Sequence, residues 1–178
     1  MISGDSTHSM LIISFCIQQK LKELPLEFQK NMEDGKAEIL EEKHKGNKIK
    51  IVVLQSDNVS MAGWLKSSIG VKADVVCLRK DSGYTNILTK QSKRIDLRWL
   101  VAYLRDEEVK LSQGKKLPIA YLMTPGKIAE APEWYYDRAT NSILNGGINP
   151  KGILPTKISL ERMKDILTEA LSRDIKIA

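Results

Sequence analysis

The chain has 178 residues, of which 42% are hydrophobic, and its formal net charge is +6. This length fits one domain and this apolar content is enough for a packed core, so extended disorder is excluded. The longest apolar run, Met10–Ile17, is shorter than the roughly 18 residues of a membrane span, and no basic residue precedes it as in a signal peptide. We therefore expect a soluble, cytoplasmic protein without a membrane partner.

Cysteine and histidine are too few and too scattered for a metal site. Cys16 and Cys77 both lie among apolar neighbours, where a free cysteine usually behaves as a small buried hydrophobic residue. Neither a zinc spacing nor a disulfide scaffold can be written with two cysteines and two histidines at these distances along the chain. We predict no metal and no cofactor.

The N-terminal part, residues 1–47, is predicted to be a helical segment. An apolar run followed by Gln-Gln-Lys continues to Leu24 with helical spacing. Pro25 suits the first turn of a second helix, which Gly35 interrupts and Gly46 ends.

Residues 48–178 read as an α/β domain in one compact unit with that segment. β-branched runs indicate strands, and apolar stripes with capping residues such as Asn58, Asp96 and Ser159 indicate helices. We expect a mixed sheet of about five to six strands packed with helices. Strands are predicted at 48–55, 72–80, 84–90 and 116–124, helices at 59–69, 97–108 and 160–171, and a hairpin at 133–137 and 142–146.

Aromatic residues cluster in the segment Pro132–Gly147. Because strand side chains alternate, Trp134 and Tyr136 share one face and Tyr135 takes the other, so one set is expected in the core and the other exposed. An exposed pair beside Arg138 would stack on bases, a contact worth about 1 to 3 kcal/mol per base. The alternative is that the large rings close the edge of the core.

Glycine follows the aromatic cluster in Asn145-Gly146-Gly147. Glycine tolerates a positive φ and has no Cβ, so this loop would let the backbone approach a phosphate. The alternative is a turn after a strand. The basic stretch Lys43–Lys50 is a second candidate for phosphate contact, with a solvated surface as its alternative.

The order of elements from Val59 to Leu104, including "ADVVCL" and "QSKRIDLRWL", resembles the accessory substrate-binding domain of DHH-type phosphoesterases. The resemblance implies a surface for phosphate-bearing substrates such as short nucleic acids, with Lys93 and Arg94 at its basic position. The Asp-His-His signature and the Gly-Gly-His loop of that family are absent, so the resemblance carries no catalytic activity to this chain.

We therefore predict a binding module for nucleic acid or another phosphorylated ligand with no catalytic site of its own, and the resemblance implies the substrate-binding part of a phosphoesterase-like protein. No nucleophile elbow, P-loop, dinucleotide or zincin motif is present. One alternative is a metal-dependent phosphoesterase or nuclease whose carboxylates converge only in three dimensions, and another is a structural or homo-oligomeric domain that uses Trp99 and Tyr103. The predicted ligand-binding residues are Lys93, Arg94, Trp134, Tyr136, Arg138, Asn145, Gly146 and Gly147.

Overall fold

The sheet contains one pair of parallel strands among the described residues. The computed structural model describes residues 5–146 and 151–173, with side chains from Gln18 onward. Strands β2 (Asn47–Gln55) and β3 (Val75–Arg79) run side by side, and the short helix α2 (Met61–Lys66) connects them. Both are buried on both faces, which is why their sequences read as continuous apolar runs.

Antiparallel strands extend this pair on both sides. The described residues form one mixed sheet of seven strands in the order β1-β2-β3-β4-β7-β6-β5. The α/β prediction is thus confirmed, with seven strands where five to six were expected. The remaining strands are β1 (Ala37–His44), β4 (Thr85–Thr89), β5 (Gly126–Ile128), β6 (Ala131–Asp137) and β7 (Ser142–Asn145).

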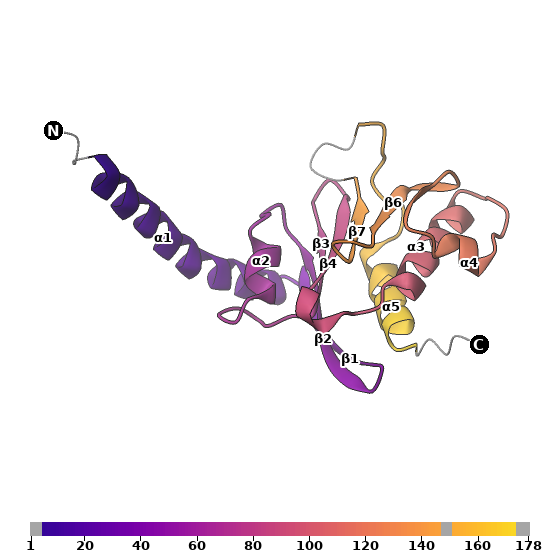
Figure 1. Ribbon diagram of the computed structural model, residues 1–178, viewed down its shortest axis with the longest axis horizontal. Helices are drawn as coiled ribbons and strands as arrows, with labels where there is room; N and C mark the ends of the chain where they lie inside the picture. The colour runs from indigo at the N-terminus through magenta and orange to yellow at the C-terminus, as the bar shows by residue number, and fades with distance from the viewer. Residues whose placement is uncertain (1–4, 147–150, 174–178) are drawn as a thin grey trace.

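Helices cover the two faces of the sheet differently (Figure 1). Helices α3 (Arg98–Leu111) and α5 (Leu160–Leu171) bury the larger apolar core, which reaches from β2 to β6. Helix α2 and the C-terminal part of α1 (Asp5–Glu33) cover only the β2 and β3 side of the opposite face. The rest of α1 extends away from the sheet as a rod, and α4 (Ile119–Leu122) lies beside α3.

Most predicted elements are confirmed. The β3–β4 and β6–β7 hairpins, α3 and α5 lie where the patterns placed them, and the hydroxyl of Ser159 caps α5 by accepting the Arg162 N–H at 3.2 Å. Cys77 is fully buried, and burial raises the pKa of its thiol to about 12. None of the described helices is long and apolar enough to cross a membrane.

Two predicted elements are wrong. Residues 37–44 form strand β1 and not a helix, because they pair with β2 from Ala37–Leu54 to His44–Asn47 through a two-residue turn. Both turn residues, Lys45 and Gly46, have the positive φ that such turns require. The sheet therefore begins ahead of the expected boundary at residue 48.

Residues 116–124, the second wrong element, contain the short helix α4 and no strand. Only Leu122 of α4 is buried, in a small core beside α3, so this apolar segment packs on one side and does not join the sheet. The prediction that a second helix begins at Pro25 is wrong as well, because helix α1 continues through this residue without a break.

Candidate functional site

A cavity of about 500 Å³, called here the first cavity, opens where three connections meet at one end of the sheet. These are the β1–β2 turn, the segment from the 3₁₀ turn η1 (Gln91–Lys93) to the start of α3, and the β6–β7 turn. Four cationic side chains line the cavity against one carboxylate. They are Lys45, Arg94, Arg98 and Arg138, and the carboxylate is Asp96.

The cations of the first cavity fall into two classes. The guanidinium of Arg98 forms a two-pronged pair with Asp96, at 2.7 and 3.0 Å, and the ammonium of Lys45 lies 3.6 Å from the same carboxylate. Arg94 and Arg138 are exposed and have no carboxylate within ion-pair distance in the described part of the chain. Two guanidinium groups are therefore available to an anion.

Asp96 fixes the wall of the cavity from which Arg98 projects. Burial by itself raises the pKa of its carboxyl, but the hydrogen bonds and charge of Arg98, with the charge of Lys45, outweigh burial and hold the pKa below its ordinary value. Its backbone N–H donates to Nε2 of buried His44 at 3.2 Å, while Nδ1 of the same ring lies 2.9 Å from the Leu171 carbonyl oxygen. A carbonyl only accepts, so Nδ1 donates, and the His44 ring links Asp96 to α5.

Tyr136 lies at the floor of the first cavity with 5% of its surface exposed. Burial raises the pKa of its hydroxyl and Asp96 adds to this, whereas Arg138 and Arg98 lower it. The ring thus gives the cavity an apolar base, and its phenol lies within the field of three charged groups.

Left-handed backbone shapes this end of the sheet. Lys45, Arg94 and Asn141 all line the first cavity and all have φ between 46° and 49°. The amide of Asn141 donates to the Ile95 carbonyl at 2.7 Å and to the Thr89 hydroxyl at 3.1 Å, so the β6–β7 turn is tied to the segment that carries Arg94. Such backbone is costly for residues other than glycine, and it concentrates at functional sites.

The structure separates the predicted site residues into two groups. Arg94, Tyr136 and Arg138 meet in the first cavity, although 42 residues separate the first two in the sequence. Lys93 lies next to them, 3.7 Å from Asp74, and lines a neighbouring cavity. These four predicted residues share one end of the sheet.

Trp134 is not part of that surface. The alternation predicted for β6 holds, with Trp134 and Tyr136 toward the core and Tyr135 exposed. The indole is completely buried, and its N–H donates to Glu108 at 3.2 Å. Trp134 therefore offers no ring face to a ligand, and we remove it from the candidate site.

Asn145 is also removed from the candidate site. It is fully buried, and its side-chain amide makes four hydrogen bonds, with the N–H groups of Thr85 and Thr156 and the carbonyls of Glu133 and Leu154. All of its hydrogen bonds hold strands and the following segment together. Gly146 has the expected positive φ of 66°, and Gly147 lies outside the described residues.

Sequence reasoning missed Arg98 as a site residue, and it favoured Asp96 as a helix cap over a carboxylate that lines a cleft. The Asp-x-Arg spacing at the start of a helix was the available signal, because a cap carboxylate often accepts from the first turn. Lys45 belongs to the basic stretch Lys43–Lys50 singled out in the sequence, and its side chain reaches the first cavity.

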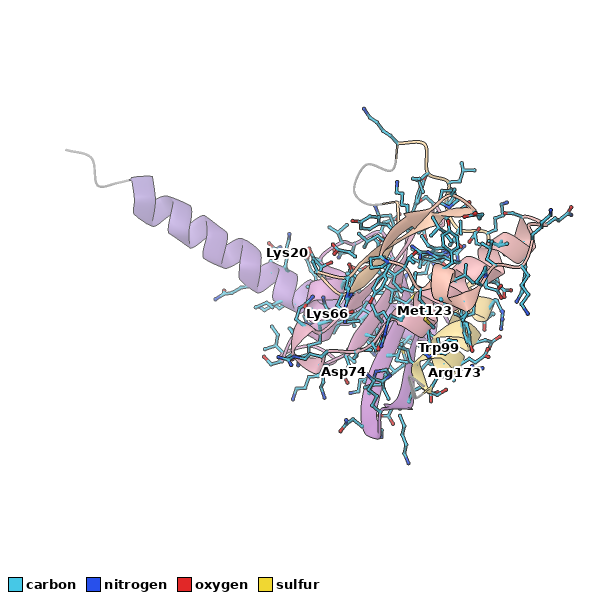
Figure 2. The ribbon with its side chains drawn as sticks, turned by 45° about the vertical axis from the view of Figure 1, so that its right-hand side comes forward. Lys20, Lys66, Asp74, Trp99, Met123 and Arg173 are labelled. Atoms are coloured by element: carbon cyan, nitrogen blue, oxygen red, sulfur yellow. The ribbon has the colours of Figure 1, made fainter. Side chains whose placement is uncertain are left out.

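The face of Trp99 and Tyr103 is occupied within the chain. Their rings meet edge to face at 5.9 Å between centroids, and the guanidinium of Arg173 lies 5.2 Å and 5.1 Å from the two ring centres. Figure 2 labels Trp99 and Arg173, which lie close together on the α3 and α5 side. Elsewhere in the described residues, no three His, Cys, Asp or Glu side chains converge as a metal site would require.

Comparison of the chain with protein families, with curated proteins and with solved structures finds no match. The first cavity is therefore interpreted from its own geometry and charge.

Proposed function

We propose that this protein binds a phosphate-bearing ligand, a nucleic acid or a phosphorylated small molecule, in the first cavity. The observation that supports this most directly is the pair of exposed arginines, Arg94 and Arg138, which face one concave site without carboxylate partners in the described part of the chain. Guanidinium groups bind phosphate oxygens through two parallel hydrogen bonds, which are among the stronger contacts available to a protein.

The surroundings of the two arginines favour an anion as well. Arg98 and Lys45 add positive charge beside them, and Asp96 neutralises only part of it. A cavity of about 500 Å³ has room for a ligand of nucleotide size, since ligand sites commonly measure about 300 to 1,000 Å³.

Titration calorimetry with inorganic pyrophosphate tests this proposal. The intact chain should bind, and the double variant Arg94→Gln/Arg138→Gln should lose at least about tenfold in affinity, because each charge-assisted hydrogen bond contributes about 1.5 to 3 kcal/mol. Affinity of the intact chain should also fall as salt is added.

Lys115→Gln/Lys116→Gln is the matched control. It removes the same charge from an exposed loop beyond the opposite end of α3. If this control loses as much affinity as the arginine variant, the binding is a general effect of net charge and the first cavity is not its site.

A further inference from the structure

A second cavity of about 280 Å³ lies on the other side of η1 from the first. Five lysines, two carboxylates and one apolar residue, Ile49, line it. Its residues come from β1, the start of β2, the segment before β3 and the end of β4, which is the same end of the sheet. Asp74, one of the two carboxylates, is labelled in Figure 2.

The carboxylates of the second cavity are already paired. Glu41 accepts from Lys48 at 2.6 Å, and Asp74 lies 3.7 Å from Lys93. Lys50, Lys72 and Lys90 have no carboxylate at ion-pair distance within the described residues, and the ammonium of Lys50 donates to the Val71 carbonyl at 3.1 Å. Each cavity thus presents two cationic side chains with neither a carboxylate nor a carbonyl partner among the described residues, Arg94 and Arg138 in the first and Lys72 and Lys90 in the second.

One short turn forms the wall between the two cavities. Lys90 and Lys93 line the second cavity, whereas Gln91 and Arg94 line the first. Arg94 is in the left-handed region, with φ and ψ both 46°, which reverses the chain after η1. Consecutive residues Lys93 and Arg94 therefore line different cavities, and the positive charge continues across the turn.

Strained backbone marks the second cavity as it marks the first. Lys72 also has a positive φ, of 59°. Among the described residues other than glycine, all those with positive φ line one of the two cavities except Gln113. These residues lie in the turns and connections that join strands at this end of the sheet, so the same set of turns builds both cavities.

We propose that a single strand of nucleic acid crosses η1 and places phosphates in both cavities. This inference rests on the proposed function of the first cavity and specifies its ligand. A small phosphorylated molecule fills one cavity and leaves the second pair of cations unused, whereas a strand repeats its charge along its length. A single strand also bends around a turn, which duplex DNA, with a persistence length of about 150 base pairs, resists.

Fluorescence anisotropy on the full chain tests the inference, using inorganic pyrophosphate as a competitor and labelled oligonucleotides of about 4, 8 and 16 nucleotides, a range typical of single-strand sites. The longer strands should bind about tenfold or more tighter than pyrophosphate. The variant Lys72→Gln/Lys90→Gln should abolish this gain in affinity and leave pyrophosphate binding unchanged. For strand binding, it should also reduce the slope of log affinity against log salt concentration by about 1.4, at about 0.7 for each lost phosphate contact.

Matched variants and probes separate the possible failures. Lys115→Gln/Lys116→Gln should leave both affinities unchanged, and thermal unfolding verifies that each variant is folded. If pyrophosphate binds and depends on Arg94 and Arg138, but longer strands gain nothing, the strand is excluded and the proposed function stands. If neither probe binds, both proposals fall.

Two further ligands test the specificity of the site. An affinity for inorganic polyphosphate equal to that for the single strand excludes nucleic acid as the preferred ligand. An affinity for a duplex equal to that for the single strand excludes the single strand as the preferred form.

Discussion

Two arginines beside strand β6 lie in opposite environments. Arg105 is completely buried, and its guanidinium donates to the carbonyls of Leu122, Thr124, Gly126 and Trp134. Arg138, just beyond the other end of β6, is exposed and has no partner in the described part of the chain. Within the fold, the two terminal nitrogens of Arg105 donate four hydrogen bonds, whereas the guanidinium of Arg138 donates none to the described residues. Position in the fold, and not residue type, therefore decides which arginine is structural and which is available to a ligand.

The carboxylates of the two regions differ in the same way. Glu108, fully buried, accepts from Trp134 at 3.2 Å, from the Thr156 hydroxyl at 2.6 Å and from the Lys157 N–H at 3.0 Å. Asp96 faces the first cavity and neutralises only part of its positive charge. A buried charge needs this full set of partners, whereas a binding surface keeps charge in excess.

Replacing each of the two arginines by methionine gives the largest expected difference, which is a difference in the free energy of unfolding. Arg105→Met leaves four carbonyls without their donor and should lower the free energy of unfolding by about 3 to 5 kcal/mol, the range for breaking a buried charged network. Burial already lowers the pKa of Arg105 to about 10, so the group is still charged at neutral pH. Arg138→Met should change stability by less than about 0.5 kcal/mol. Urea unfolding measures both.

The variant that loses more stability, Arg105→Met, should lose less affinity for pyrophosphate than Arg138→Met. Arg138→Met should bind about tenfold more weakly, while folded Arg105→Met should bind as the intact chain does. Equal losses of stability in the two variants would remove the distinction between the regions.

The sequence predicted individual strands and binding residues better than it predicted which of them lie together in the fold. Alternation separated Tyr135 from Trp134 and Tyr136, but both faces of β6 carry rings, so the pattern did not say which set the core would take. Helices α3 and α5 decide this by covering one face only. Arg94 and Arg138 were chosen separately and meet because β4 pairs with β7.

Edge strand β1 was the main element that the sequence analysis predicted wrongly, as a helix. Its run of Glu and Lys has helix-forming residues, and only pairing with β2 makes it a strand, as tertiary context often overrides propensity. Charged residues are usual on an exposed edge, where they discourage pairing with other chains. The Lys45-Gly46 turn was the local signal, and it also places Lys45 at the first cavity.

Removing the carboxylate of the first cavity is the second test, with a smaller effect. Asp96→Asn keeps an acceptor for the Arg98 N–H but releases Arg98 and Lys45, so pyrophosphate affinity should rise up to about fivefold, equivalent to about 1 kcal/mol. Stability should fall by about 1 kcal/mol or less at neutral pH. Calorimetry and urea unfolding measure the two changes.

The pH dependence of the Asp96→Asn stability change follows from the sign of the pKa shift. The folded pKa of Asp96 lies below its ordinary value of 3.8, so its contribution is complete above that pH and is lost as the pH falls through the folded value. Variant and intact chain should therefore converge in stability under more acidic conditions. A difference that stays constant through this range would assign the effect to packing and not to charge.

Replacing strained residues by glycine is the third test, and it separates the relief of backbone strain from the loss of a binding side chain. Arg94 and Gln113 both have left-handed backbone, but only Arg94 lines a cavity. This conformation costs other residues about 1 to 2 kcal/mol, and the added freedom of an unfolded glycine offsets about 0.5 to 1 kcal/mol, so each glycine variant should gain about 0 to 1.5 kcal/mol of unfolding free energy. Arg94→Gly should lose about tenfold in pyrophosphate affinity and Gln113→Gly none. Since both variants relieve strain of the same kind, a loss of affinity confined to Arg94→Gly assigns that loss to the guanidinium and not to the relief of strain, whereas equal affinity in the two variants would remove Arg94 from the binding site.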